Sequence, residues 1–122
     1  MKKILLVEDD PFLIDIYKDK LEESGYAVET VEDGDQVLNK ITEARPDLVL
    51  LDIILPNVDG WEILRTIRNK PDTKDLKVII LSNLGQKEEV EKGVDLGATK
   101  YLIKAHFTPS EVIKEIKELL NK

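Results

Sequence analysis

The sequence predicts an α/β fold: one doubly wound parallel sheet of five strands, with five helices covering its two faces. The first observation behind this prediction is Leu48–Leu51, a wholly apolar run typical of a strand buried on both faces. Similar apolar runs alternate strictly with segments of helical periodicity along the chain. The 122 residues also contain no linker, repeat or low-complexity tract, so we expect one domain over residues 1–122.

Composition narrows the class of protein. A formal net charge of −7 argues against direct nucleic-acid binding, and the absence of cysteine excludes disulfides and thiolate metal sites. The N-terminal apolar run, Ile4–Val7, is too short for a signal peptide. No run reaches the roughly 18 apolar residues of a membrane span. We therefore expect a cytoplasmic protein without membrane insertion.

The first two elements are a strand and a helix. Ile4–Val7 is the predicted strand, and three acidic residues follow it. Pro11 favours a helix start there, because proline suits the first helical turn. Ser24 and Gly25 are expected to end that helix, since glycine readily adopts the left-handed cap conformation. The predicted apolar stripe of the helix is Phe12, Leu13, Ile16, Tyr17 and Leu21.

The next strand and helix precede the central strand. Tyr26–Val31 alternates in the manner of a half-buried strand. The second helix is predicted to start at residues 33–35, with an apolar side formed by Val37, Leu38 and Ile41. After the central strand and Asp52, residues 56–60 form a predicted loop. The third helix then has the apolar stripe Trp61, Ile63, Leu64 and Ile67.

The C-terminal part of the chain repeats the alternation. Val78–Leu81 and Lys100–Ile103 are predicted strands. The helix between them is thinly apolar, with Val90, Val94 and Leu96. It contains Gly93, which costs about 1 kcal/mol relative to alanine, so we expect it to be the least stable helix. Thr108 as a cap and Pro109 predict the start of the last helix. The apolar side of that helix is Val112, Ile113, Ile116, Leu119 and Leu120.

Right-handed crossovers between parallel strands favour the flavodoxin-like strand order 2-1-3-4-5. In that order the chain reverses direction between strands one and three, and ligands bind at the carboxyl ends of the strands at this point. Strand one ends at Glu8, Asp9 and Asp10, and strand three ends at Asp52. The sequence therefore predicts a cluster of carboxylates at the switch point.

Carboxylates without cysteine, and with a single histidine in the chain, form a site for a hard cation. Mg²⁺ fits best, with Mn²⁺ as an alternative. Ser82 and Lys104 end strands four and five and suit the oxygens of a phosphoryl group, for which Asp52 is the candidate nucleophile. Each residue alone has an ordinary explanation as a turn, cap or solvated strand end. Their joint placement on four strand ends favours the functional interpretation.

Four motifs of the sequence resemble the motifs of one protein family. They are Leu6–Asp10, Asp52 with the loop Leu55–Gly60, Leu81–Asn83, and Gly97–Lys104. In this order, and along essentially its whole length, the chain resembles the receiver domain of two-component response regulators, in particular single-domain, chemotaxis-type receivers. The resemblance implies self-catalysed phosphorylation and slow dephosphorylation rather than a conventional enzyme.

The resemblance implies a role for each matching residue. Asp52 would accept a phosphoryl group from a sensor histidine kinase or a phosphotransfer protein. Mg²⁺ would be bound by Asp9 directly, by Glu8 through water, by Asp52, and by the Ile54 carbonyl. Ser82 and Lys104 would bind phosphoryl oxygens. Tyr101 would change rotamer as Ser82 moves, and so alter the surface of helix four, strand five and helix five for a protein target.

The chain departs from the family pattern after Lys104. Ala105 and His106 separate Lys104 from Phe107, where the family usually has proline directly after the lysine, so we expect a trans Lys104–Ala105 bond.

Asn83 is also larger than the small residue usual at its position, so we expect narrower access to the phosphoryl group. Ile54 and Leu84 occupy positions where other receivers carry polar residues near the attacking water. We expect these two side chains to slow loss of the phosphoryl group.

Other functions remain open at this level. A degenerate receiver could dock partners without phosphorylation, although its intact acidic set argues against this. A flavodoxin would need hydroxyl and backbone donors for the FMN phosphate where the acidic residues stand, and an independent hydrolase would need a histidine base. The predicted oligomeric state is a monomer or a phosphorylation-dependent dimer. We expect either a free-standing receiver or an excised domain.

Overall fold

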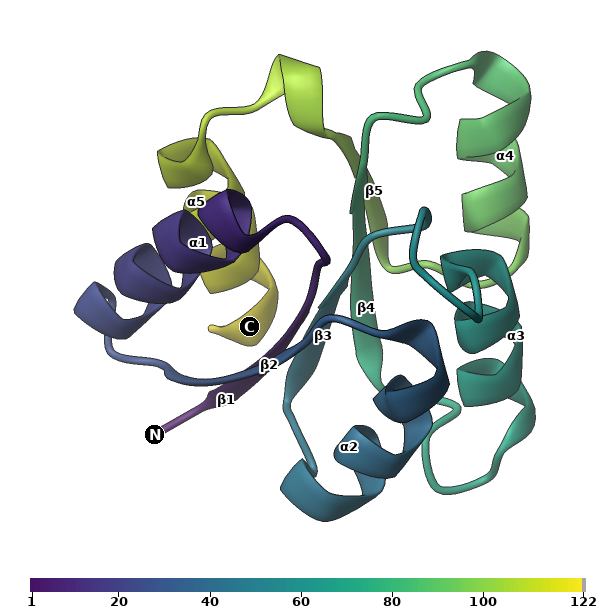
Figure 1. The fold of residues 1–122 in the computed structure, drawn as a ribbon, viewed down its shortest axis with the longest axis horizontal. Helices are drawn as coiled ribbons and strands as arrows, with labels where there is room; N and C mark the ends of the chain where they lie inside the picture. The colour runs from purple at the N-terminus through teal and green to yellow at the C-terminus, as the bar shows by residue number, and fades with distance from the viewer. Residues whose placement is uncertain (122) are drawn as a thin grey trace.

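The computed structural model describes residues 1–121, and its elements alternate along the chain as predicted (Figure 1). The strands are β1 (Lys3–Val7), β2 (Ala27–Val31), β3 (Leu48–Leu51), β4 (Lys77–Ser82) and β5 (Lys100–Ile103). The helices are α1 (Pro11–Glu23), α2 (Val37–Ala44), α3 (Gly60–Asn69), α4 (Lys87–Asp95) and α5 (Pro109–Leu120). Two short 3₁₀ turns, Gly34–Gln36 and Lys104–His106, precede α2 and follow β5.

The five strands form one parallel sheet in the order β2-β1-β3-β4-β5, which confirms the predicted fold class and strand order. The register places Val7 beside Leu51 and Leu51 beside Ile80, so β1, β3 and β4 end close together. Residues that directly follow these strands therefore share one edge of the sheet, at the top of Figure 1.

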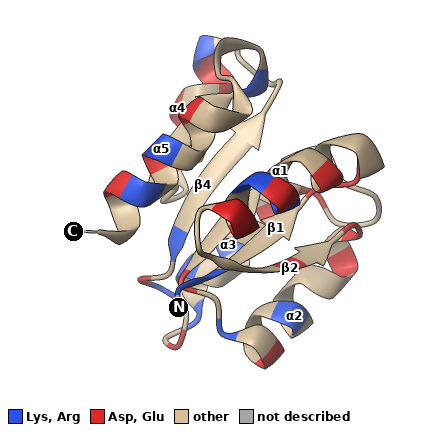
Figure 2. Ribbon diagram, turned by 90° about the vertical axis from the view of Figure 1, so that its left-hand side faces the viewer, with Lys and Arg blue, Asp and Glu red and all other residues tan. Residues whose placement is uncertain are grey.

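Two apolar cores lie on the two faces of the sheet. Successive residues of β3 alternate between them: Leu48 and Leu50 join the core with α1 and α5, whereas Val49 and Leu51 join the core with α2 and α3. Figure 1 shows the same division of the helices, with α4 on the side of α2 and α3. Charged residues gather on the helices and loops, and β4 is uncharged beyond its first residue (Figure 2). The sheet is therefore the two-sided apolar layer that the wholly apolar runs predict.

Two predicted apolar stripes are partly wrong. Phe12 was expected on the buried side of α1, but 72% of its surface is exposed, and Ile14, Tyr17 and Leu21 form the buried side instead. Val94 was expected to anchor α4, but 56% of it is exposed, and the buried residue of α4 is Gly93. Phe12 lies two positions before Ile14 along the helix, so their side chains point in nearly opposite directions. Phe12 therefore faces away from the side of α1 on which Ile14 is buried.

Local signals at the helix ends are confirmed. Asp10 accepts a hydrogen bond from the Phe12 N–H and caps α1, whose C-terminal end is followed by Gly25 at φ 94°. Thr108 and Glu111 form a reciprocal capping box at the start of α5. These caps fix where the loops at the carboxyl edge of the sheet begin.

Candidate functional site

Five predicted side chains meet at the carboxyl edge of the sheet. Glu8 and Asp9 follow β1, Asp52 follows β3, Ser82 ends β4 and Lys104 follows β5. Backbone bonds carry the strand pairing past the last strand residues: the Glu8 N–H donates to the Val31 carbonyl at 3.0 Å and the Asp52 N–H to the Val7 carbonyl at 3.1 Å. Regular strand geometry thus places both carboxylates, without requiring a specialised loop.

Three of these five polar residues are buried, which is unusual for such side chains. Among residues 1–121, the buried polar or charged side chains are Glu8, Asp52 and Ser82, which are 3%, 6% and 0% exposed. A buried carboxylate is strongly disfavoured unless it is paired and hydrogen-bonded. The pairing is therefore the feature that makes this site stable.

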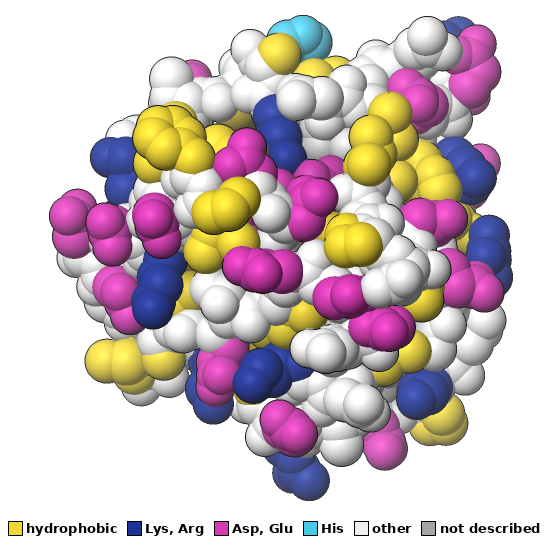
Figure 3. Space-filling view, viewed as in Figure 1, with side chains coloured by type: hydrophobic (Ala, Val, Ile, Leu, Met, Phe, Trp, Pro, Cys, Tyr) yellow, Lys and Arg dark blue, Asp and Glu magenta, His cyan; other side chains and the backbone are white. Residues whose placement is uncertain are grey.

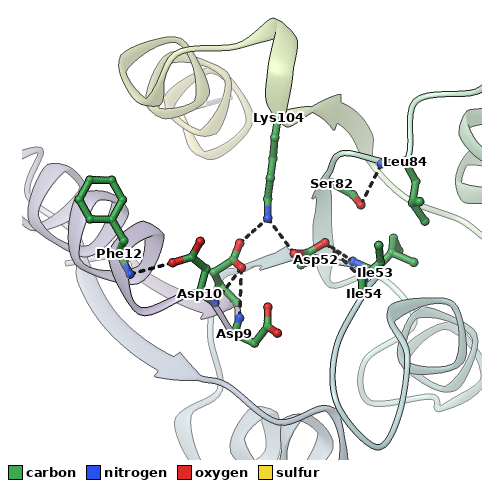
Figure 4. A network of polar contacts seen from close by, with 10 residues as sticks. Asp9, Asp10, Phe12, Asp52, Ile53, Ile54, Ser82, Leu84 and Lys104 are labelled. Atoms are coloured by element: carbon green, nitrogen blue, oxygen red, sulfur yellow. Dashed lines mark hydrogen bonds and ion pairs between the residues drawn. The ribbon is translucent and has the colours of Figure 1, made fainter.

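Lys104 supplies the compensating charge. Its Nζ lies 2.7 Å from Glu8 Oε1 and 2.8 Å from Asp52 Oδ2, and its side chain is only 14% exposed (Figure 4). The other oxygen of each carboxylate accepts backbone bonds. Glu8 Oε2 accepts from the N–H groups of Asp9 and Asp10, and Asp52 Oδ1 accepts from that of Ile53 at 2.7 Å and, at 3.4 Å, from that of Ile54.

Burial and the ion pair together shift the pKa values of Glu8 and Lys104. Burial raises the pKa of Glu8 above its ordinary value of 4.5, and the bond from Lys104 only partly opposes this. Burial alone would lower the pKa of Lys104, but the hydrogen bonds to Asp52 and Glu8 outweigh it and raise that pKa. Lys104 is therefore held in its charged form, whereas burial makes the ionisation of Glu8 more costly than in water.

Glu8, Asp9 and Asp52 could together hold a metal ion. One carboxylate oxygen from each lies within 4.8 Å of the others, and Asp9 is exposed whereas its two partners are buried. An all-oxygen, negatively charged donor set suits a hard divalent cation. Acidic side chains gather beside a basic one on this face, with hydrophobic side chains on either side (Figure 3).

Asp10 is the acidic residue that does not join the cluster. Its carboxylate caps α1 by accepting the Phe12 N–H at 2.9 Å. Pro11, directly after it, is the sequence signal for this role, because proline at the first helical position makes the preceding residue the cap. Ile54 was predicted to offer its carbonyl to a metal. The structure places Ile54 directly beside the site, with its side chain 60% exposed.

Ser82 and Tyr101 both bond to the backbone of one residue of the β4–α4 loop, Leu84. The Leu84 N–H donates to Ser82 Oγ at 3.3 Å, and the Tyr101 hydroxyl donates to the Leu84 carbonyl at 2.5 Å. The Tyr101 ring covers Gly93, where an added Cβ would lie 2.6 Å from the ring. Burial, with help from Glu89 and Asp52, raises the pKa of Tyr101 to about 12. Tyr101 thus joins the site to the inner face of α4.

The segment that follows β5 begins with the Lys104–Ala105 peptide bond. No cis peptide bond occurs within residues 1–121, so the Lys104–Ala105 bond is trans as predicted, and residues 104–106 form a 3₁₀ turn. His106, within this turn, is exposed. The ion pair between Lys104 and Glu8 was not predicted. Its only sequence signal is that both residues directly follow strands of one sheet.

The fold and the pocket define a class of protein: a parallel α/β domain with a buried acidic pocket at its topological switch point, suited to a divalent cation and a phosphoryl group. Residues 4–117 match the response regulator receiver domain, and the chain belongs to this family. Receiver domains of two-component systems are phosphorylated on an aspartate with Mg²⁺, and the pocket of Glu8, Asp9 and Asp52 fits that chemistry.

Known proteins agree with this membership. The chain is 35% identical to the DNA-binding dual master transcriptional regulator RpaA of Synechocystis, over 100% of the chain and 50% of that protein. The BeF3-activated N-terminal receiver domain of Klebsiella pneumoniae RstA matches with a TM-score of 0.91 and 28% identity, over 99% of this chain and 100% of that one. The chemotaxis response regulator CheY4 of Vibrio cholerae matches with a TM-score of 0.89 and 30% identity, over 97% of this chain and 98% of that one.

The chain spans about half the length of the curated relatives it matches. Within residues 1–121, no helix combines the length and apolar character needed to cross a bilayer.

Proposed function

We propose that this protein is a phosphorylation-dependent signalling receiver in which Asp52 accepts the phosphoryl group. The single observation that carries the proposal is the position of Asp52. Its Oδ2 lies 2.8 Å from a lysine ammonium, and its carboxylate belongs to the three-carboxylate cluster with Glu8 and Asp9. A nucleophile, a fixed cation and a metal-binding acidic set thus lie within contact distance of one another.

The proposed chemistry is a transfer from a phosphohistidine of a sensor kinase or phosphotransfer protein. An Asp52 carboxylate oxygen forms the new P–O bond, the P–N bond of the donor breaks, and the electron pair leaves with the imidazole. Mg²⁺, held by Glu8, Asp9 and Asp52 with the Ile54 carbonyl as a further donor, would offset the charge on the phosphoryl oxygens. In this proposal Lys104 binds a second phosphoryl oxygen, and Ser82 a third.

Phosphorylation is proposed to reach the protein surface through the backbone of Leu84. If the Ser82 hydroxyl turns toward a phosphoryl oxygen, the Leu84 N–H loses its present acceptor, and the Tyr101 bond to the Leu84 carbonyl responds. Tyr101 packs on Gly93, so α4, β5 and α5 form the surface that changes. We propose that this surface binds a downstream protein, as a monomer or as a phosphorylation-dependent dimer.

Magnesium binding separates this proposal from a degenerate receiver that binds partners without phosphorylation. Calorimetric titration of the purified protein with Mg²⁺ is expected to show one site. Glu8→Ala and Asp9→Ala should each weaken binding by about tenfold or more, since they remove donors. Asp10→Ala is the matched control, because Asp10 caps α1 instead of facing the cluster. Absence of binding by the unmodified protein would favour the degenerate receiver.

Ser82→Ala is expected to leave phosphorylation possible but to weaken the response of α4. The Ser82 hydroxyl is proposed to link the phosphoryl group to Leu84. The new P–O bond forms on Asp52, so phosphorylation does not require that hydroxyl. Amide hydrogen exchange of α4, with and without phosphorylation, measures the response. A Ser82→Ala protein whose α4 responds as fully as the unmodified protein would remove Ser82 from the link.

The phosphorylated state is expected to be long-lived. Hydrolysis needs an oriented water, and the side chains proposed to flank its approach, Ile54 and Leu84, cannot hydrogen-bond it. The Ile54→Asn, Leu84→Glu double variant should lose its phosphoryl group faster, by roughly tenfold, because water-positioning groups are restored. Decay in excess Mg²⁺ measures the rate. Equal lifetimes in the two proteins would show that these side chains do not set it.

A further inference from the structure

The loop after β2 is tied to the loop after β3 by two hydrogen bonds. Asn57 Nδ2 donates to Asp33 Oδ2 at 2.7 Å, and the Gly34 N–H donates to the Pro56 carbonyl at 3.1 Å. We call Asp33, Gly34, Pro56 and Asn57 the interloop latch. None of these residues belongs to the acidic pocket.

The backbone is shaped around this contact. Asn57 has φ 68°, a left-handed conformation that asparagine tolerates better than most residues. A Cβ added to Gly34 would lie 1.8 Å from the Val58 carbonyl oxygen, so the approach of the two loops requires glycine. Asp33 is itself fixed, since its Oδ1 accepts the Asp35 N–H at 3.2 Å. Each of the two loops thus has a backbone shape that fits the contact between them.

The loop held by the latch begins at Asp52, and its far end, at Gly60, returns close to the Asp52 backbone. Its first two N–H groups, those of Ile53 and Ile54, donate to Asp52 Oδ1. At its end, the Gly60 N–H donates to the Ile53 carbonyl at 2.8 Å, and a Cβ on Gly60 would lie 2.5 Å from the Asp52 carbonyl oxygen. A shift in the middle of this loop is therefore transmitted to the groups that orient the Asp52 carboxylate.

We propose that Asp33 and Asn57 are positioning residues for the Asp52 site. Their bond holds the β3–α3 loop so that the Ile53 and Ile54 amides keep one Asp52 oxygen turned inward, and the other faces Lys104 and the cation pocket. The inference deepens the proposed function and rests on it. Asn57 also holds the pKa of Asp33 below its usual range, through the same hydrogen bond.

The test uses variants that separate the bond from the backbone. Asn57→Gly removes the amide but keeps the left-handed conformation accessible, and it should weaken Mg²⁺ binding by about threefold to tenfold. Asn57→Asp places a carboxylate beside Asp33 and should weaken it more. The double variant Asp33→Asn, Asn57→Asp exchanges donor and acceptor and should restore affinity to within about twofold of the unmodified protein.

Thr42→Ala is the matched control. It removes another exposed hydrogen bond, that from Thr42 Oγ1 to the Leu38 carbonyl on α2, and should leave Mg²⁺ affinity unchanged. Calorimetry with MgCl₂ measures affinity, and urea unfolding verifies that each variant is folded during the titration. Unchanged affinity in Asn57→Gly, or failure of the exchanged pair to restore it, would overturn the proposal.

A second measurement works without metal. Amide hydrogen exchange of Ile53 and Ile54 in the metal-free protein should be about threefold faster or more in Asn57→Gly, and slow again in the exchanged pair. If the unmodified protein binds no Mg²⁺ but exchange responds in this way, the proposed function fails and the latch stands. Exchange that is equal in all variants would overturn the latch alone.

Discussion

Lys104→Met is expected to lower the free energy of unfolding of the metal-free protein by about 3–5 kcal/mol near neutral pH, because breaking a buried ion pair leaves uncompensated charge. Lys104 is the cation that contacts both Glu8 and Asp52, at 2.7 and 2.8 Å, and both carboxylates are buried. Methionine preserves much of the apolar stem and removes the charge. Urea denaturation of the two proteins without metal measures the difference.

The matched control for this variant is Lys100→Met, at the start of the strand β5 that Lys104 follows. Lys100 lies 3.2 Å from Glu115, but the two side chains are 31% and 24% exposed. Such a partly solvated pair contributes at most about 1 kcal/mol. A loss from Lys100→Met as large as that from Lys104→Met would mean that the buried pair has no special role.

The pH dependence of this loss follows from Glu8. Its pKa in the folded protein is raised above 4.5, so the folded chain holds that proton more tightly than the unfolded chain does. The contribution of Glu8 to stability is therefore full below its unfolded pKa and falls as the pH rises through its folded pKa. Without Lys104 the folded pKa of Glu8 should rise further, so the total loss with rising pH becomes larger. The difference between the two proteins should therefore be smaller at about pH 5 than at about pH 7.5.

Magnesium should recover part of the loss, since a bound cation replaces the missing ammonium charge. The increase in unfolding free energy on adding MgCl₂ is expected to be larger for Lys104→Met than for the unmodified protein. An equal increase in both would indicate that Lys104 and the cation do not share the same carboxylates.

The fold was predictable because it depends on the order of apolar runs. Leu48–Leu51 can bury all its side chains only if helices cover both faces of the sheet. The strict alternation of strands and helices then leaves few possible arrangements of that sheet. Phe12 and Val94 were wrongly predicted to lie on buried helix faces, because the sequence alone does not determine which face of a helix is buried. A helical stripe fixes spacing, but several stripes fit the same apolar residues, and only packing against the sheet chooses Ile14 over Phe12.

The site was predictable to the extent that strand ends determine it. Glu8, Asp52, Ser82 and Lys104 all follow or end strands, so the strand order brings them to one edge. The contacts between side chains could not be predicted. Whether Lys104 pairs with Glu8, or Asn57 reaches Asp33, depends on rotamers and loop paths that leave no periodic signal in the sequence.

Asp52→Asn is expected to abolish phosphorylation completely, because the amide lacks the anionic oxygen that forms the P–O bond. Asparagine has nearly the same shape and can still accept the Ile53 N–H, so the fold should persist. Asp47→Asn is the matched control, since Asp47 precedes the opposite end of the same strand and accepts the Lys3 N–H at 2.8 Å. It should be phosphorylated like the unmodified protein.

The decisive measurement is the intact mass of each protein after incubation with acetyl phosphate and Mg²⁺. We predict one added phosphoryl group in the unmodified protein and in Asp47→Asn, dependent on Mg²⁺, and none in Asp52→Asn. Equal incorporation by Asp52→Asn and the unmodified protein would contradict the assignment of Asp52 as the phosphoacceptor.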